Sequence, residues 1–233
     1  YCGQFQQNDA ESAKLILGGD LTAESSSCTV YITQGTVIFN GTEQQTVKNL
    51  KVYDIEVLNK AGIKYLSNVN LYGHYDLNGN PLDNGVYVTY MYNGATFEDG
   101  SDYKEIVTSG EVTLRSNIKG NLTVRNVLNI PEGAKFTIDG NCTVYAKRAS
   151  YSSDGTIKNN GTLNCTGDLT LEADSNYCGQ FQQNDAESAK LILGGDLTAE
   201  SSRCTAYITQ GTVIFNGTEQ QTVKNIKAPS III

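Results

Sequence analysis

Apolar and polar residues alternate along this chain in short bursts of three to five positions. Examples are Cys28/Val30/Ile32, Ile55/Val57, Val69/Leu71, Val112/Leu114, Leu122/Val124, Phe136/Ile138 and Leu169/Leu171. Alternation over so few residues is typical of a β-strand with one buried face. Glycine and asparagine fill the gaps, as in GGD, NGT, KGN, DGN and NNG, which indicates tight turns. No stretch shows sustained helical spacing, so the pattern predicts an all-β protein.

The bursts recur with a short period of about 22 residues. Leu15 is followed at that interval by Val37, and Val47 is followed by Val69. Short strands, a fixed period and glycine at the corners predict a parallel β-solenoid, or β-helix, of about ten rungs in which like residues stack above like residues. An antiparallel β-sandwich would explain the alternation but not a constant offset between inward residues.

A long repeat lies on top of the short one. Residues 1–51 match residues 177–227 with three differences, which are Ser27/Arg203, Val30/Ala206 and Leu50/Ile226. The offset between the copies, from Tyr1 to Tyr177, equals eight of the short periods. We therefore interpret 1–176 as one full long repeat of about eight rungs, 177–227 as the start of a second, and 228–233 as a non-repeating tail, all in one continuous solenoid. Eight rungs about 4.8 Å apart predict copies displaced by roughly 38 Å along the axis.

Composition narrows the possible partners. The net charge of −8 argues against nucleic acid and against anionic lipid, because both need clustered lysine and arginine. No apolar run reaches the roughly 20 residues that a membrane-spanning helix needs, so we expect no membrane insertion. The chain opens on Tyr1 and has no signal peptide, which we interpret as an excised fragment or a processed chain.

One segment carries a family resemblance. GTVIFNGTEQQTVKNLKVYDIEVLNKAGIKYLSNVNLYGHYDLNGN, residues 35–80, resembles the repeats of large bacterial cell-surface proteins, and its opening recurs at residues 211–225. The resemblance implies parallel β-helix rungs in a secreted or surface-exposed adhesin. It also implies a structural role next to neighbouring repeats of the same chain, with no catalysis and no cofactor. We therefore expect a repeat rod that extends or forms part of an adhesin.

The six cysteines recur at intervals close to one rung. Cys2 and Cys28, like Cys178 and Cys204, lie 26 residues apart, and Cys142 and Cys165 lie 23 apart. We expect each pair in neighbouring rungs, as a disulfide or as stacked thiols, because rung spacing matches the Cα separation of a disulfide. There is no C-x-x-C pair, and the one histidine, His74, sits in turn-like text, so neither a zinc site nor a Cys–His nucleophile is expected.

A carbohydrate-active β-helix, of lyase or hydrolase type, is the alternative. Such sites need clustered carboxylates across neighbouring rungs. The candidates are Asp20, Glu24, Asp76, Asp83, Glu98, Asp99 and Asp102. Most lie in turn-like text, where aspartate has a local backbone role. The stretch DLNGNPLDNG, residues 76–85, is similar to a calcium loop but lacks its ligand spacing and its final glutamate, so no metal site is expected.

Tyrosines form the second possible site. Tyr87, Tyr90 and Tyr92 lie in GVYVTYMYNG. If Val86 and Val88 point inward, Tyr87 points outward, and Tyr90 and Tyr92 share the inward parity unless a bulge intervenes. Exposed tyrosines hold sugars or protein partners by stacking, whereas cross-strand stacking only stabilises the sheet. A host surface protein or glycan is therefore a possible partner at these three residues.

Overall fold

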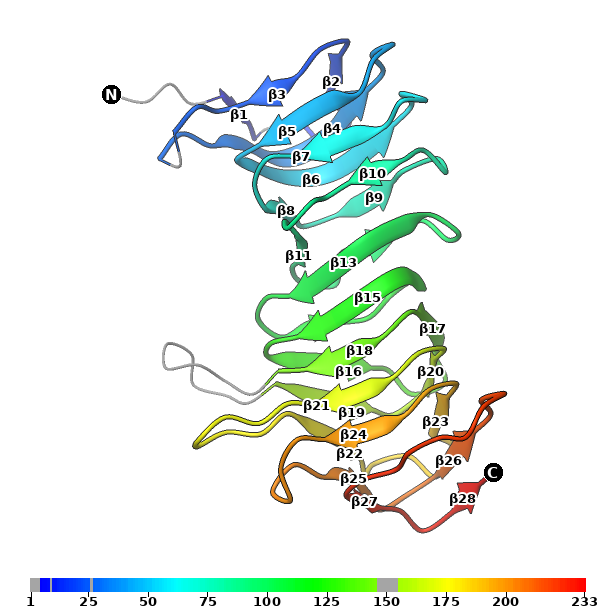
Figure 1. Cartoon of the computed structure of the whole chain (residues 1–233). Helices are drawn as coiled ribbons and strands as arrows, with labels where there is room; N and C mark the ends of the chain where they lie inside the picture. The colour runs from blue at the N-terminus through cyan, green and yellow to red at the C-terminus, as the bar shows by residue number, and fades with distance from the viewer. Residues whose placement is uncertain (1–4, 9, 26, 146–154) are drawn as a thin grey trace. The chain divides into compact units, whose positions relative to one another are not determined.

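The computed structural model describes residues 5–8, 10–25, 27–145 and 155–233 of the chain (Figure 1). The chain forms two compact units, Tyr1–Ile106 and Val107–Ile233, called here the N-terminal and the C-terminal unit. Short strands joined by turns build both units, and the described residues contain no helix. The prediction of an all-β fold is therefore confirmed. It also follows that no described segment is a helix long and apolar enough to cross a bilayer.

Most strands are only two to five residues long, as the short bursts of alternation predict. Those of the N-terminal unit are β1 (Phe5–Gln7), β2 (Lys14–Leu17), β3 (Leu21–Thr22), β4 (Val30–Phe39), β5 (Gln45–Lys48), β6 (Leu50–Val57), β7 (Ile63–Tyr65), β8 (Val69–Leu71), β9 (His74–Asp76), β10 (Leu82–Asp83), β11 (Thr89–Met91) and β12 (Thr96–Phe97). The boundary between the units falls within β13 (Asp102–Thr108). Those of the C-terminal unit are β14 (Val112–Thr113), β15 (Ile118–Val124), β16 (Val127–Ile130), β17 (Lys135–Asp139), β18 (Cys142–Val144), β19 (Thr156–Asn159), β20 (Thr162–Cys165), β21 (Leu169–Leu171), β22 (Gln180–Gln183), β23 (Lys190–Leu193), β24 (Leu197–Ala199), β25 (Ala206–Ile208), β26 (Thr212–Phe215), β27 (Ile226–Lys227) and β28 (Ile231–Ile232).

Strands of successive turns pair in parallel and form three ladders within the described part of each unit. In the N-terminal unit the ladders are β1–β4–β6–β8–β11, β2–β4–β6–β9–β12 and β3–β5–β7–β10. In the C-terminal unit they are β14–β16–β19–β22–β25–β27, β15–β17–β20–β23–β26–β28 and β15–β18–β21–β24. Each turn is thus one rung of a parallel β-solenoid, and this prediction is confirmed.

The length of a rung varies, although the strands stay in register. Val37 pairs with Leu15 at the interval that the period predicts, but its pairing with Ile55 spans a shorter stretch of chain. In the C-terminal unit the pairing of Leu163 with Leu191 spans a longer stretch than predicted. Val47 stacks on Tyr65 and not on Val69, so this predicted pair is wrong. The connections between strands absorb the difference in length, because a longer turn at the corner leaves the hydrogen-bonded ladder unchanged.

Inward residues of successive rungs stack into columns that form the core. One column runs through Val37, Ile55, Tyr75 and Phe97, and each of these side chains is buried. The rings of Tyr75 and Phe97 are tilted, with centroids 6.3 Å apart. Stacking identical or similar apolar groups in this way removes nearly all of their surface from water, which is the main stabilising term of such a fold.

The buried tyrosines of the N-terminal unit satisfy their hydroxyl groups inside the core. The Tyr65 hydroxyl lies 2.8 Å from that of Tyr75 and 3.0 Å from Oγ1 of Thr89. The Tyr103 hydroxyl donates to the backbone oxygens of Tyr75 and Glu98. Burial raises the pKa of Tyr65 to about 12 and also raises the pKa of Tyr75. These phenols therefore stay neutral at physiological pH.

The two copies of the long repeat build the same corner with the same bonds. Gln45 Nε2 donates to the oxygens of Leu17 and Gly19, and its Oε1 accepts from the Gly41 amide. The matching Gln221 donates to the oxygens of Leu193 and Gly195 and accepts from the Gly217 amide. The same text therefore folds the same way in two different units. The displacement of roughly 38 Å stays a prediction, because the copies belong to different units.

One glycine in each copy occupies a backbone position that a larger residue would strain. Gly35 has φ of 81° and Gly211 has φ of 77°, a conformation that side chains with a Cβ rarely adopt. A Cβ at Gly35 would also overlap the backbone oxygen of Ala13, and one at Gly211 would overlap that of Ala189. Any larger residue here would have to push neighbouring rungs apart.

The tail at 228–233 differs in sequence from the first copy but continues the solenoid. Ile231 pairs with Val213, as Ile55 pairs with Val37 in the first copy. Pairing depends on the backbone, so the tail keeps the ladder with different side chains.

Candidate functional site

Tyrosines gather on the outer surface of the N-terminal unit, where the first ladder meets the corner of each rung. We call Tyr31, Tyr53, Tyr72, Tyr90 and Tyr92 the tyrosine flank. They come from β4, β6, β11 and the residues that follow β8 and β11. Their neighbours along the strand, such as Val52, Leu71 and Met91, are buried, so strand alternation directs the tyrosines outward.

One column of the flank alternates tyrosine with polar groups. Register pairs Tyr31 with Lys51, Lys51 with Asn70, and Asn70 with Tyr90. The Lys51 ammonium lies 5.8 Å from the centre of the Tyr31 ring, within the range of a cation–π contact. The column therefore offers aromatic faces next to hydrogen-bond donors and acceptors.

A second column lies at the corner itself and holds Tyr53, Tyr72 and Tyr92. The Tyr72 amide donates to the Val52 oxygen and the Tyr92 amide to the Leu71 oxygen, which places these tyrosines in successive rungs. The rings of Tyr72 and Tyr92 stack, with centroids 4.8 Å apart and planes 18° apart. Burial, together with Tyr92 and Tyr31, raises the pKa of Tyr72. Tyr53 keeps 42% of its surface exposed.

The structure places the three predicted tyrosines differently from the parity argument. Val86 is 88% exposed, so the assumption that it points inward is wrong. Thr89 and Met91 point inward instead, and Tyr90 and Tyr92 share the outward face. Tyr87 is half-buried at the end of a turn, where its amide donates to the Asn84 oxygen. The turn at 84–87 resets the parity before β11 begins, which alternation alone does not reveal.

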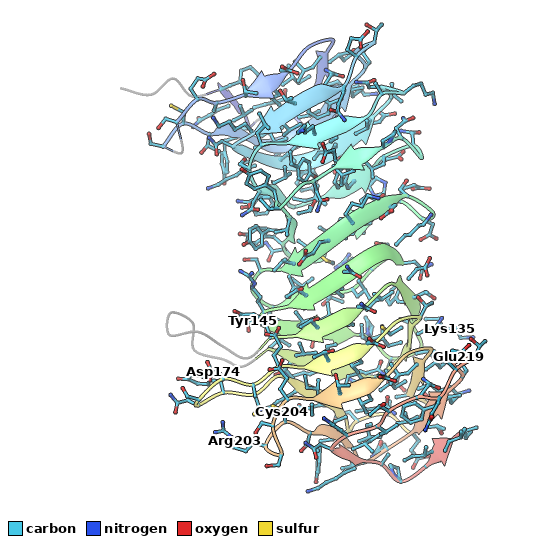
Figure 2. The ribbon with its side chains drawn as sticks, viewed as in Figure 1. Lys135, Tyr145, Asp174, Arg203, Cys204 and Glu219 are labelled. Carbon is cyan, nitrogen blue, oxygen red and sulfur yellow. The ribbon has the colours of Figure 1, made fainter. Side chains whose placement is uncertain are left out.

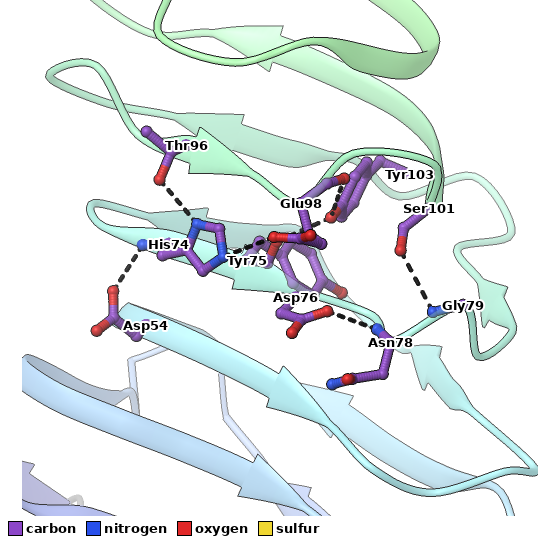
Figure 3. Close-up of polar contacts among 10 residues, drawn as sticks. All are labelled: Asp54, His74, Tyr75, Asp76, Asn78, Gly79, Thr96, Glu98, Ser101 and Tyr103. Carbon is purple, nitrogen blue, oxygen red and sulfur yellow. Dashed lines mark hydrogen bonds and ion pairs between the residues drawn. The ribbon is translucent and has the colours of Figure 1, made fainter.

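Past the corner that holds Tyr53, Tyr72 and Tyr92, the same rungs carry a polar surface that we call the acidic flank (Figure 3). It is formed by Asp54, Glu56, His74, Asp76, Thr96 and Glu98. His74 begins strand β9, so its prediction as a turn residue is wrong. Its Nδ1 lies 2.8 Å from Oγ1 of Thr96, its Nε2 lies 3.6 Å from a carboxylate oxygen of Glu98, and its amide donates to Asp54. Glu56 pairs in register with Asp76, which places carboxylates in neighbouring rungs.

Most polar contacts on the acidic flank hold the backbone. Asp54 accepts from the His74 amide at 2.6 Å, and Asp76 accepts from the Asn78 amide at 2.6 Å, which closes a local turn (Figure 3). The His74–Glu98 pair is open to water, since 44% and 53% of these side chains are exposed. Within the described residues, no group of three or more histidine, cysteine or acidic side chains is placed to hold a metal ion.

The C-terminal unit carries a column of charged and aromatic side chains that the apolar pattern does not predict, called here the charged column. Arg125, Tyr145, Glu172 and Glu200 each follow the strand of one rung, since Val124, Val144, Leu171 and Ala199 pair in sequence. The Arg125 guanidinium lies 5.5 Å from the centre of the Tyr145 ring. Burial raises the pKa of Glu172, Glu200 raises it further, and Arg125 opposes the shift. The similar triplets LTV, CTV, LTL and LTA just before these residues are the sequence signal for this column.

The cysteine pairs have three outcomes. Cys28 is disulfide-bonded, and Cys2, its predicted partner, lies outside the described residues. Cys178 and Cys204 are free, and the Cys204 thiol donates to the Glu172 oxygen at 3.4 Å. Cys142 and Cys165 are also free, but Cys142 stacks on Leu169 and Cys165 on Ile138. The last two therefore lie in different columns, because the rung that begins at Cys142 is longer than the interval to Cys165.

Comparison with known proteins gives no relative from which a function could be transferred. The chain matches no family model, no curated protein and no solved structure.

Proposed function

We propose that the chain is a structural repeat element of a secreted bacterial surface protein, a β-solenoid that extends or forms part of an adhesin. The observation that carries the proposal is the second copy of the long repeat, which makes the same ladder pairs and the same glutamine-centred corner as the first. Because the repeated rungs fold alike in both copies, a further copy can be added to the chain without a change in its sequence. Each further repeat lengthens the molecule and multiplies any surface it carries.

Small-angle X-ray scattering tests the structural role. A variant with residues 1–176 duplicated ahead of the present chain adds about eight rungs. We expect its maximum dimension to exceed that of the present chain by roughly 38 Å, from a rung spacing of about 4.8 Å. An unchanged maximum dimension with a larger cross-section would mean that repeats pack side by side, and the proposal would be wrong. Antibodies against the chain should also label intact cells of the source organism.

The tyrosine flank supports a second candidate function, the binding of a glycan. Sugar rings stack their C–H faces on exposed aromatic side chains, and Tyr31 and Tyr53 offer such faces, at 36% and 42% exposed. Lys51 and Asn70 lie in the same column as Tyr31, next to the column of Tyr53, and supply polar groups for sugar hydroxyls. An aromatic surface with few charges fits a neutral polysaccharide better than an acidic one, because the chain as a whole carries a net charge of −8.

The second copy provides a matched control for glycan binding. Tyr207 and Lys227 repeat the Tyr31–Lys51 pair, with the ammonium again 5.8 Å from the ring centre. Pro229 takes the corner position that Tyr53 holds in the first copy. On a panel of neutral polysaccharides, Tyr31→Ala should lower affinity about tenfold, the loss of roughly 1.4 kcal/mol. Tyr207→Ala should leave it unchanged, and equal losses in both variants would refute binding at the flank.

The same panel separates binding from catalysis. Depolymerisation of any polysaccharide that Glu172→Gln abolishes would replace the structural proposal with a carbohydrate-active one, centred on the charged column of the C-terminal unit.

A further inference from the structure

Two loops of the C-terminal unit extend from its rungs next to each other (Figure 1). The first, residues 172–179, joins β21 to β22 and forms a small hairpin. Its Asp174 amide donates to the Tyr177 oxygen, and its Gly179 amide donates to the Glu172 oxygen. The second, residues 200–205, joins β24 to β25, and its Cys204 amide donates to the Ser201 oxygen. We call them the hairpin loop and the neighbouring loop.

One of the three differences between the copies lies at the contact between these loops. Arg203 replaces Ser27 of the first copy, and its guanidinium donates to the backbone oxygens of Asp174 at 2.9 Å and Ser175 at 3.2 Å. Figure 2 shows Arg203, Asp174 and Cys204 on the same side of the unit. The guanidinium thus fixes the neighbouring loop against the hairpin loop.

Cys178 and Cys204 both lie next to Glu172, at the base of the hairpin loop. Cys178 closes the hairpin through a bridge to Ala173, and the Cys204 thiol donates to the Glu172 oxygen at 3.4 Å. Both cysteines are buried, and the Glu172 oxygen that accepts from the Cys204 thiol also accepts from the amide of Gly179, the residue after Cys178. The matching Cys28 of the first copy is disulfide-bonded. We propose that Cys178 and Cys204 form a disulfide that clamps the hairpin loop to the neighbouring loop.

The bond forms by thiol–disulfide exchange with an external disulfide, either a small molecule or an oxidoreductase. Cys178 is the more accessible of the pair, at 9% exposed against 0%. Its Sγ loses a proton and attacks the external disulfide, which forms a mixed disulfide and releases one external thiol. Sγ of Cys204 then loses its proton and attacks Sγ of Cys178, which expels the second external thiol. Two protein thiols are oxidised, and one external disulfide is reduced to two thiols.

The environment of the thiols sets the conditions for this reaction. Burial, with a further contribution from Cys178, raises the pKa of the Cys204 thiol to about 12. The thiolate is the attacking species, so the second step becomes faster as pH rises toward that value. Burial, with a further contribution from Cys165, raises the pKa of Cys142, and burial raises that of Cys165 to about 12, but the strand register holds these two cysteines in different columns of the core. We therefore expect them to remain thiols under the same conditions.

Peptide mapping of the full chain tests the clamp. The chain is equilibrated with oxidised and reduced glutathione until Cys28 is fully oxidised, and the remaining thiols are alkylated after denaturation. Cleavage before aspartate gives one fragment, Asp174–Asn184, with Cys178 and another, Asp196–Ile233, with Cys204. We expect these fragments to be disulfide-linked and the alkylated thiols to fall from the four free cysteines of the structure to two, Cys142 and Cys165.

Three variants complete the test. Cys204→Ser should abolish the linked fragments, whereas Cys165→Ser should leave them in place. Alkylation of both Cys178 and Cys204 in chains whose Cys28 is oxidised would overturn the proposal, as would a link from Cys178 to Cys165. Arg203→Ser, which restores the residue of the first copy, should slow formation of the link because the loops lose a contact that holds the thiols together.

Discussion

The two copies allow one substitution to be made in two structural contexts with the same flanking sequence. Phe5 and Phe181 both lie in the text CGQFQQN. Phe181 is fully buried, with Ile157 in the rung before it and Ala206 in the rung after it. Phe5 pairs with Val30 on one side and is 46% exposed. Local propensities cancel in this comparison, so any difference between Phe181→Ala and Phe5→Ala reports stacking between rungs.

The burial of each ring gives the expected magnitudes. Removing a fully buried phenylalanine costs about 3–5 kcal/mol, because the lost transfer energy is joined by a cavity. Phe5 is about half exposed, and its removal leaves a space open to water. We therefore expect Phe5→Ala to lower the free energy of unfolding by about 1 kcal/mol, half of the value for burying such a side chain. With a urea m-value of about 2 kcal/mol per molar, the midpoint should fall by about 2 M for Phe181→Ala and about 0.5 M for Phe5→Ala.

Urea unfolding followed by circular dichroism and by tyrosine fluorescence measures both shifts. Agreement between the two probes in the parent chain is needed first, because repeat arrays unfold in stages when their cooperativity fails. Leu191→Ala and Leu15→Ala form a second matched pair, since Leu191 is fully buried and Leu15 is partly exposed. If each pair gave equal shifts, coverage by the adjacent rung would not be what stabilises these positions, and the reasoning would be refuted.

Three further predictions concern the core and the corners. Burial raises the pKa of Tyr65 to about 12, so its contribution to stability is present below pH 10 and is lost as pH rises from 10 to 12. In urea unfolding, the free energy of unfolding of Tyr65→Phe should therefore fall less than that of the parent between pH 10 and pH 12. Gln45→Ala should lower the free energy of unfolding by about 2–3 kcal/mol and Gln221→Ala by only about 1 kcal/mol, because Gln45 is buried whereas water can replace the half-buried Gln221. Equal losses of stability in thermal or urea unfolding would contradict this. Gly211→Ala should cost at least about 1 kcal/mol from its positive φ alone, with more from the overlap at the Ala189 oxygen, and a stability equal to the parent's would mean that the corner tolerates a Cβ.

The sequence by itself determines the architecture, because the fold repeats a simple rule. Alternation identifies bursts such as Val69/Leu71 and Leu169/Leu171 as strands with a buried face, and the structure confirms both as β8 and β21. The recurrence of these bursts identifies a solenoid, since inward residues of each rung must meet those of the next. The duplicated text predicts duplicated contacts, and the two glutamine-centred corners confirm it.

The surface chemistry depends on register, which the sequence leaves open. The turn before β11 brings Tyr90 and Tyr92 outward and leaves Val86 in solvent. The rung that begins at Cys142 ends beyond Cys165, at Leu169, although the interval between the two cysteines predicts a pair. The physical reason is that corner turns vary in length at little cost, whereas the ladders between them keep every backbone hydrogen bond. Which side chains meet on a flank is therefore decided by the lengths of the turns, and those are fixed only when the rungs stack.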